Sequence, residues 1–545
     1  MKKLTIILIC AALCIPGFTS CDKNDRGSGL NHMYNAPLLG NPQSLDPQFA
    51  DDPSSNTVIK NLYSGLLKLD SKGNISCCNA ESYSVSDDRK VYTFKLRKDN
   101  CWFFDLNKND IIEDGECFPV TARDYVFALK RILDPKMQSP YANSFSCIKN
   151  GRSIADGSAS PDSLGVSALN EFTLEITLDY PTAEFLPVLA SSAAFPCNEE
   201  FFNSTKGRYG LDDRSIMSNG AFYVRQWFYD PYGNHNILYM KRNEKNAGEA
   251  YEICPSYLSF TIEKNESDIR DCLKDDSIEC LSTFNNSYSG KKYSVTEGSA
   301  YTLGLVFNPK DNYFSNKNLR KALAMTIDRE ALAKKAGSGV KIADGIIPPS
   351  VMIAGRSYRE LSSDKQFDSF DSEKAKEYME TAKSELKIGS LENVKILVCT
   401  EIINSANLIE LSQQWQNTLG IYIGIEDVSH KDFLRRVSEG DYTIALYPLK
   451  GRIGIVSSVL EQFETTECLK HASDGVAHSE NVRKSDTVPK LVENCTAAER
   501  DILSAFGFIP LFYKSTYFVT DIDNEDILFD PFTEAADFRL AKNYG

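Results

Sequence analysis

Strand and helix signals alternate through residues 394–447, and this alternation constrains the fold more than any other feature of the sequence. It predicts three strands and two helices, at residues 394–399, 405–418, 421–426, 431–438 and 442–447. Units of this βαβαβ kind form right-handed crossovers with parallel strands. Because ligands of open α/β sheets bind beyond the carboxyl ends of the strands, we expect a site at the segments that follow Cys399, Glu426 and Tyr447.

The last of these segments, residues 448–454, combines two glycines with two basic side chains. Gly451 and Gly454 permit a close approach of the backbone to a ligand, and Lys450 and Arg452 supply positive charge. The alternative is a surface connection whose charges are solvated. The segment is therefore a candidate ligand site, with both interpretations open.

The first third of the chain contains the same mixture of elements. Residues 92–97 and 172–178 alternate apolar and polar side chains, as half-buried strands do. Between them, an apolar face over residues 125–133 predicts a helix that Thr121 caps and that ends at Asp134. Both parts of the chain therefore indicate a mixed α/β protein.

The composition sets broad limits. The chain has 545 residues, about four times a typical domain length, so several domains are expected. Its net charge of −15 argues against nucleic acid or an anionic membrane surface as the main partner. The longest apolar stretch, residues 4–18, is shorter than the roughly 20 residues that a membrane-spanning helix needs.

The first residues are typical of an export signal. Lys2 and Lys3 precede an apolar run at residues 4–13, and small residues stand just before Cys21. This layout resembles a bacterial lipoprotein signal, although Phe18 replaces the usual leucine. It predicts a signal peptide at residues 1–20, lipid on Cys21, and a tether over residues 21–30. The alternative is ordinary cleavage nearby and a soluble exported protein.

Twelve of the 15 cysteines remain after the signal peptide and the lipidated position are set aside. In an exported protein they can form disulfides, but the spacing fixes no connectivity and contains no zinc-type pair. The adjacent Cys77 and Cys78 are the most unusual. We expect at least half of the twelve to be small buried hydrophobic residues.

Motifs for catalysis are missing. The five histidines have no spacing typical of metal ligands, and neither a nucleophile elbow nor a phosphate-binding loop occurs. The sequence therefore predicts a protein that is not an enzyme and has no cofactor, with calcium as the one exception to be tested.

That exception is an acidic loop with the spacing of an EF-hand. Its candidate ligands are Asp105, Asn107, Asn109, Glu113 and Glu116. Asp110 occupies the sixth position, where the turn normally needs glycine, and no flanking helix pair is evident. A solvated acidic loop is the alternative.

Several runs resemble, in order and spacing, the bacterial oligopeptide-binding proteins, the family 5 solute-binding components of ABC peptide importers. The matching runs include residues 44–47, 61–67, 80–82, 92–97, 119–124, 139–142, 219–222, 319–329, 347–349 and 415–421. The likeness covers nearly the whole mature chain.

The resemblance implies an α/β, two-lobed periplasmic binding protein type II-like fold with an additional inserted domain. Lobe I is expected from residues 31–75, 190–302 and 509–545. The insert, domain II, is expected at residues 76–189, and lobe II, domain III, at residues 303–508.

The resemblance also implies a function. A monomeric, lipid-anchored receptor at the periplasmic side or cell envelope would capture oligopeptides between its lobes. It would deliver them to an ABC importer permease, which is driven by a separate ATPase. Two alternatives stay open: the same fold with another solute, such as a murein peptide, an acidic or blocked peptide, a metal complex or haem, or an envelope enzyme or adhesive protein that has lost transport.

Ligand-contact residues follow from the resemblance position by position. Asp51, Asp52 and Pro53 match a segment that contacts the peptide backbone, and Tyr141 and Asn285 match side-chain contacts. The remaining positions depart from the family: His430 replaces a frequent tryptophan, Leu446 an arginine, Leu305 a glutamate, and Arg452 the aspartate that holds the peptide's α-amino group.

Arg452 would repel an ammonium group, by about 1 to 4 kcal/mol at about 4 Å. One explanation is that Glu461 or Glu464 supplies the missing carboxylate. Another is a ligand that lacks a free amine or carries an acidic group, which an arginine can bind with two hydrogen bonds. A third is that Arg452 faces solvent.

Overall fold

The computed structural model describes residues 31–105, 107–109, 113, 115–233, 235–245, 253–285, 287–288, 292–335, 339–362, 370–473 and 479–544. The predicted signal peptide and tether, with Cys21, lie outside these residues. None of the helices within the described ranges is long and apolar enough to cross a membrane.

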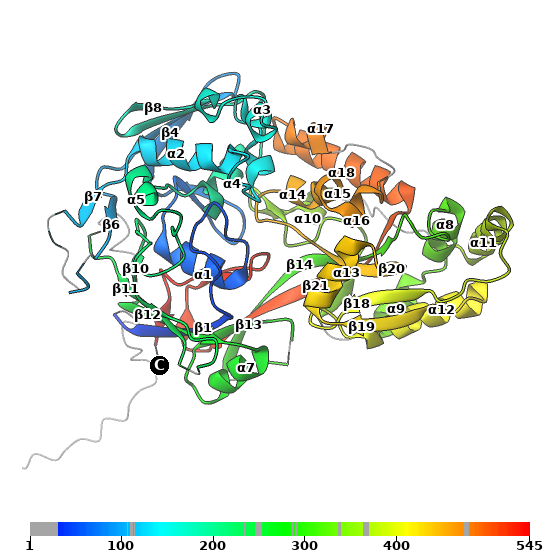
Figure 1. Cartoon of the computed structure of the whole chain (residues 1–545). Coiled ribbons are helices and arrows are strands. Elements are labelled where there is room, and N and C mark those ends of the chain that lie inside the picture. Colours follow the sequence, from blue (N-terminus) through cyan, green and yellow to red (C-terminus); the bar gives the residue numbers. More distant parts are fainter. Residues whose placement is uncertain are drawn as a thin grey trace, which may run out of the picture.

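Lobe I is built on a four-stranded sheet, seen at the lower left of Figure 1. Its order is β1 (Met33–Leu39), β12 (Tyr257–Glu263), β11 (Ile237–Arg242) and β10 (Phe222–Phe228). β1 pairs with β12 in parallel, whereas the other neighbours are antiparallel. Alternate residues of β12 are buried, including Phe260, so one face of the sheet packs on the core. Helix α1 (Pro53–Leu62) begins at its cap Asp52.

The insert contributes a second four-stranded, antiparallel sheet. Its order is β4 (Ala80–Val85), β5 (Val91–Leu96), β9 (Thr173–Thr177) and β8 (Val166–Asn170). Helix α2 (Ala122–Leu133) covers it and has the predicted start, since Asp124 accepts a hydrogen bond from the Thr121 backbone N–H at 2.7 Å. Phe94, Tyr125 and lobe I residues such as Tyr34 share one hydrophobic core.

A seven-stranded sheet contains the predicted βαβαβ unit of lobe II. Strand β18 (Lys395–Cys399) is parallel to both β19 (Gly424–Val428) and β20 (Ile444–Lys450), as the sequence predicts. Helices α12 (Ile409–Leu419) and α13 (His430–Glu439) connect these strands. Other helices of this part are α8 (Lys317–Met325), α9 (Arg329–Lys335), α11 (Ser372–Leu386), α14 (Ser457–Leu460) and α18 (Val488–Ala505).

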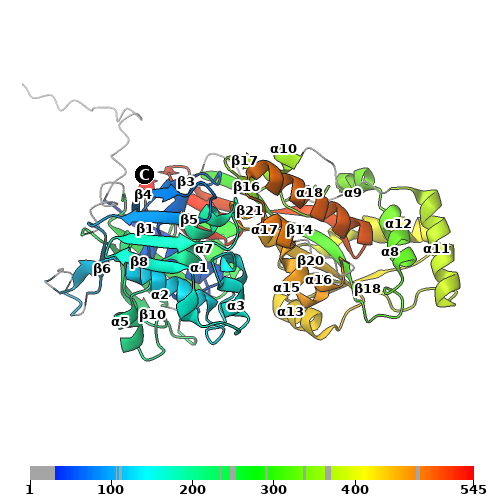
Figure 2. The ribbon, with the colours of Figure 1, turned by 90° about the horizontal axis from the view of Figure 1, so that it is seen from above.

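Two long strands of this sheet run from one lobe to the other. β14 (Tyr293–Phe307) pairs with β21 (Phe508–Asp521) along nearly its whole length. At the lobe I end β21 also pairs with β13 (Cys280–Thr283), and at the lobe II end β14 pairs with β20. The expected lobe boundary at residues 302 and 303 therefore falls inside β14. Figure 2 shows both strands between the two halves of the elongated molecule.

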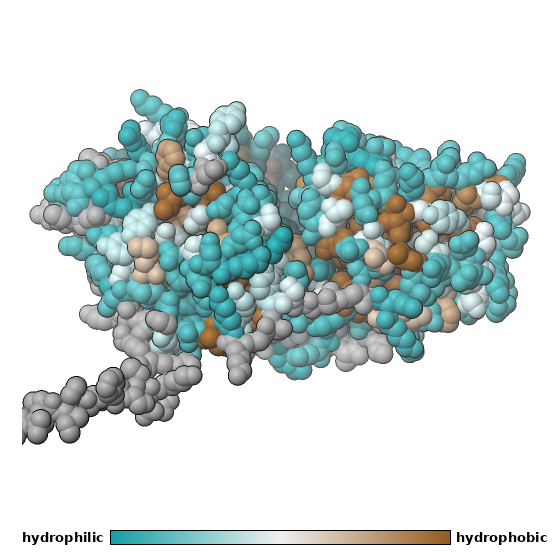
Figure 3. All heavy atoms as spheres, turned by 90° about the horizontal axis from the view of Figure 1, so that it is seen from below, coloured by the Kyte–Doolittle hydropathy of each residue, from teal (hydrophilic) through white to brown (hydrophobic). Residues whose placement is uncertain are grey.

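The cores follow this division. One core contains mostly residues of lobe II, and the other combines lobe I with the insert. On the face shown in Figure 3, hydrophilic side chains cover most of both halves, and apolar surface appears chiefly on the half formed by lobe II. Eight of the twelve cysteines after Cys21 are buried, so the expectation that at least half of them are buried is confirmed.

Candidate ligand-binding cleft

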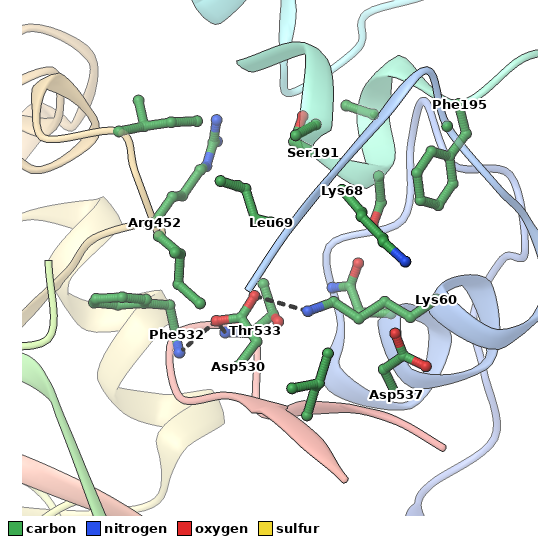
Figure 4. Close-up of a pocket in the computed structure, with 18 of the residues that line it drawn as sticks. Lys60, Lys68, Leu69, Ser191, Phe195, Arg452, Asp530, Phe532, Thr533 and Asp537 are labelled. Carbon is green, nitrogen blue, oxygen red and sulfur yellow. Dashed lines mark hydrogen bonds and ion pairs between the residues drawn. The ribbon is translucent and has the colours of Figure 1, made fainter. Parts of the chain in front are cut away.

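A cavity of about 360 Å³ lies between lobe I, the insert and lobe II, and it is within the size range of ligand sites. Its walls come from chain segments that are far apart in the sequence: α1 and residues 63–71, residues 140–141, residues 190–195, residues 450–455 and residues 528–539. Figure 4 shows side chains from opposite walls that point into this space. We refer to it as the cleft.

Five of the predicted ligand contacts line the cleft. They are Asp51, Tyr141, Lys450, Gly451 and Arg452. The neighbouring Asp52 and Pro53 instead begin helix α1, where the Asp52 carboxylate accepts a hydrogen bond from the Ser55 N–H at 2.9 Å. The structure thus brings Asp51 of lobe I, Tyr141 of the insert and Arg452 of lobe II to one cavity.

Three other predicted contacts lie away from the cleft lining. Asn285 is exposed just after β13. His430 is exposed at the start of α13, where its N–H donates to Glu401 at 3.1 Å. Leu446 is 2% exposed and lies opposite Leu305 of β14, so both leucines belong to the core of lobe II.

The expectation of a site at all three strand ends needs a correction. Only the segment after β20 reaches the cleft, whereas the segments after Cys399 and Glu426 do not line it. The reason is the antiparallel pairing of β20 with β14, which continues to Lys450 and carries the end of β20 toward lobe I. The predicted strand ended at residue 447, three residues too early, because β20 continues to Lys450.

Gly451 and Gly454 serve contacts within the protein. A Cβ atom on Gly451 would stand 2.7 Å from a methyl carbon of Val351. Gly454 has a φ of +75°, and a Cβ atom there would stand 3.0 Å from the Cβ of Pro187 in the insert. The glycines therefore let the turn of lobe II approach its neighbours closely.

Sequence reasoning missed much of the lobe I wall. Lys60 of α1 forms an ion pair with Asp530 at 3.0 Å, and Arg539 pairs with Asp537 at 2.6 Å. Lys68 also points into the cleft (Figure 4). The only available signal was the acidic and aromatic run at residues 529–538, which has no motif of its own.

Arg452 reaches across the cleft to the insert. Its Nη1 donates to the Ser144 hydroxyl at 2.8 Å, and the guanidinium lies 5.1 Å from the centre of the Tyr141 ring. Burial raises the pKa of Tyr141 to about 12, although the charge of Arg452 opposes this shift. The Tyr141 hydroxyl donates to the Ala50 carbonyl, so this ring is fixed on both sides. Arg452 is half-buried and does not simply face solvent.

The two glutamates considered as replacement amine anchors are held elsewhere. Arg483 lies 2.8 Å from the Glu464 carboxylate and 3.6 Å from that of Glu461. Glu461 lines a separate cavity of about 20 Å³ with Glu184 of the insert, and neither glutamate lines the cleft. Burial raises the pKa of Glu184 to about 7, and its carboxylate accepts a hydrogen bond from the Ser457 N–H at 3.0 Å.

The comparison with family models decides the classification. The model described as bacterial extracellular solute-binding proteins, family 5 Middle, matches residues 78–467. The chain belongs to this family. Membership makes it an extracellular solute-binding protein of the group that includes the peptide-binding components of ABC importers, and not an enzyme.

Known family 5 proteins resemble the chain over most of its length. The oligopeptide-binding protein OppA of Bacillus subtilis is 24% identical over 505 residues, which cover 87% of this chain and 84% of the relative. The periplasmic murein peptide-binding protein MppA of Escherichia coli is 27% identical over 414 residues, 74% and 72% of the two chains. A structure of the pheromone receptor PrgZ, described with its mode of peptide binding, superposes with a TM-score of 0.74 at 25% identity and covers 94% of this chain and 100% of that one. The predicted family and the mixed α/β, multi-domain fold class are confirmed.

The acidic loop of this family 5 protein is only partly described. Asn107 and Asn109 donate to the Glu113 carboxylate at 3.2 and 3.1 Å, and Arg225 lies 3.8 Å from Asp105. Glu116 accepts a hydrogen bond from the Glu113 N–H at 3.1 Å. Within the ranges that the structure covers, no three His, Cys, Asp or Glu side chains are placed to hold a metal, and Asp110 lies outside them. Calcium binding stays a prediction.

Proposed function

We propose that this protein captures oligopeptides in the cleft between its lobes and delivers them to the permease of an ABC importer. The observation that carries the proposal is the convergence of Asp51 and Tyr141 from one side with residues 450–452 from the other around one cavity. A ligand in this cavity touches both lobes at once, so it favours the arrangement in which they are close. The relatives OppA, an oligopeptide-binding protein, and MppA, a murein peptide-binding protein, support a peptide as the ligand.

The ligand is tested by native mass spectrometry of the chain purified from a bacterial host. We expect a heterogeneous set of added masses that fragment as peptides. A matched pair of variants shows where they bind: Ser191→Trp fills the cleft, whereas Ser204→Trp places the same side chain on the exposed surface of α5 (Glu199–Ser204). Peptide loss in the first variant alone supports the proposal. The proposal is contradicted if the wild-type protein carries no peptide and binds none from added peptide pools.

Membrane attachment is a separate part of the proposal. We infer that the cysteine at position 21 carries lipid and that the polar tether after it, residues 22–30, holds the receptor near its permease. Metabolic labelling with an alkyne fatty acid should label the wild type and leave Cys21→Ser unlabelled. Equal labelling of both proteins would exclude this anchor.

Delivery of peptides to the permease is tested with the importer in nanodiscs. We expect the peptide-loaded receptor to stimulate ATP hydrolysis by the importer more than the empty receptor does.

A further inference from the structure

Arg452 is a cation of the cleft wall whose close contacts are neutral. Within the part of the chain that the structure describes, its guanidinium contacts the Ser144 hydroxyl and the Tyr141 ring, and no carboxylate lies within ion-pair distance. Gly451 beside it has no charge, and Lys450 adds a second positive charge to the same wall. The lobe II side of the cleft is therefore positively charged, in a protein whose net charge is −15.

Two other cations of the cleft are neutralised within the protein. Lys60 has Asp530 at 3.0 Å, and Arg539 has Asp537 at 2.6 Å (Figure 4 shows the first pair). These pairs explain how lobe I keeps charged groups in a partly buried wall. The charge of Arg452 is not compensated in this way, since its contacts Ser144 and Tyr141 carry no charge.

The nearest acidic groups of lobe II serve Arg483. Glu461 is 9% exposed and faces the smaller cavity, and Glu464 holds Arg483 at 2.8 Å. Burial raises the pKa of Glu461, and the charges of Arg483 and, to a smaller extent, Arg452 oppose this shift. Neither glutamate is thus placed to bind a ligand amine in the cleft.

The free donors of Arg452 suit a carboxylate. A guanidinium has five N–H donors in a planar fork, and Ser144 uses one of them. The remaining donors can bind a carboxylate with two parallel hydrogen bonds. A ligand ammonium at the same place would leave two like charges together in a partly buried wall, with donors facing donors.

We propose that ligands of this receptor place an acidic group, and not a free α-amino group, against Arg452, so that acidic peptides with a blocked or distant amino terminus are its preferred substrates. This proposal rests on the proposed function, because it assumes that peptides bind in the cleft. It adds the charge and orientation of the ligand. Asp51, which is exposed on the opposite side of the cleft, is the alternative site for a ligand amine.

The experiment uses three tetrapeptide libraries with amidated carboxyl ends and three randomised positions. Their first residue is N-acetyl-Asp, N-acetyl-Asn or Asn with a free amine. Competition binding to the full chain, followed by native mass spectrometry, should show the N-acetyl-Asp library bound at least about tenfold more tightly than either of the others, as a charge-assisted hydrogen-bonded pair provides. In Arg452→Gln this preference should fall to less than about twofold, and Arg452→Lys should retain part of it.

Matched variants separate the possible outcomes. Lys470→Gln removes one positive charge from lobe II at an exposed position outside the cleft, and it should keep the preference intact. Ser144→Ala removes the hydroxyl partner but keeps the charge, so the preference should survive. The proposal is overturned if the free-amine library binds best, and most clearly if Asp51→Asn abolishes that binding. It is also overturned if the preference for N-acetyl-Asp persists in Arg452→Gln. If no library binds to the wild type, the proposed function itself fails.

Discussion

Glu184 is a buried carboxyl group at the contact between the insert and lobe II. It directly precedes α4 (Phe185–Ala190), and its carboxylate accepts a hydrogen bond from the N–H of Ser457 at the start of α14. Burial and, to a smaller extent, the nearby Glu461 raise its pKa to about 7, against the effect of the Ser457 hydrogen bond. The thiols of Cys147 and Cys495 complete the surroundings, since Glu184 raises the pKa of both.

The raised pKa of Glu184 predicts a pH-dependent stability. The folded protein keeps this proton up to about pH 7, whereas the unfolded chain releases it near the ordinary value of 4.5. The stabilisation is complete below about pH 4.5 and is lost as the pH rises through about 7, and it corresponds to about 3 kcal/mol. Glu184→Gln keeps the acceptor without the charge, so calorimetry at pH 8 should show the variant melting at a higher temperature than the wild type, with the difference absent at pH 5.

A comparison with an exposed glutamate isolates this effect. Glu480→Gln removes the same charge from a residue that is paired with Lys484 at the surface of the protein. Asp46 and Glu279 also have raised pKa values and contribute to the pH dependence of both variants equally. If Glu184→Gln and Glu480→Gln respond to pH in the same way, Glu184 is ionised at no cost and the interpretation is wrong.

At the scale of elements, the hairpin of β6 (Cys101–Phe103) and β7 (Cys117–Pro119) holds two cysteines on one face. Phe103 is opposite Cys117 and Cys101 is opposite Pro119, so the two cysteines are diagonal neighbours. Burial raises the pKa of the Cys101 thiol, and the neighbouring Cys117 thiol raises it as well. Residues 102–116, which include the acidic loop, lie between them.

We predict that an oxidising compartment converts this pair into a disulfide. The two thiols lose two protons and two electrons to a disulfide oxidant such as oxidised glutathione, which becomes two thiols. Closing a loop of about 15 residues stabilises a protein by roughly 3 kcal/mol. After oxidation, peptide mapping should find Cys101 joined to Cys117, and the melting temperature should rise in the wild type and in Cys468→Ser but not in Cys101→Ser. Mapping that finds both thiols still reduced would contradict the prediction.

The elements that the sequence predicted are those whose signals are local. Buried parallel strands are continuous apolar runs, so β18 and β20 were placed within a few residues, and the Thr121 and Asp134 signals defined α2. The long strands β14 and β21 were not predicted as strands. Their register shifts near Ser299 and Leu303 interrupt any simple alternation, and they pair with each other across roughly 200 residues of intervening chain.

The residues of the cleft were likewise predictable only where the sequence or the resemblance gave a local signal. Tyr141 was identified because a resemblance supplied its position, whereas Arg452 was also indicated by its place after the third strand of the βαβαβ unit. The pair of Lys60 and Asp530, which joins residues 470 positions apart, had no local pattern that could reveal it. Leu446 was named from the resemblance, and its burial was not foreseen because its partner Leu305 on β14 is distant in the sequence.

For the whole molecule, Arg483 is the residue that ties the lobes together away from the cleft. It donates to the Asn143 side chain of the insert at 3.0 Å and pairs with Glu464 and Glu461 of lobe II. At the same contact between the insert and lobe II, the Ala183 N–H donates a hydrogen bond to the Ser485 carbonyl. These contacts require the insert and lobe II to be close, and the large sheet through β14 and β21 is the continuous connection between the lobes.

Removal of the Arg483 contacts should therefore both separate the insert from lobe II and weaken ligand binding. In Arg483→Met, the buried Glu461 loses its main cation, so the closed arrangement becomes less favourable and the affinity for bound peptide should fall by about tenfold or more. Small-angle X-ray scattering should give a larger radius of gyration for the unliganded variant, with part of the difference recovered by saturating peptide. Arg435→Met is the matched control, because it removes an arginine whose partners, Asp432 and Glu439, lie on its own helix α13. Equal radii of gyration and equal affinities for the two variants would show that the Arg483 contacts do not hold the lobes together.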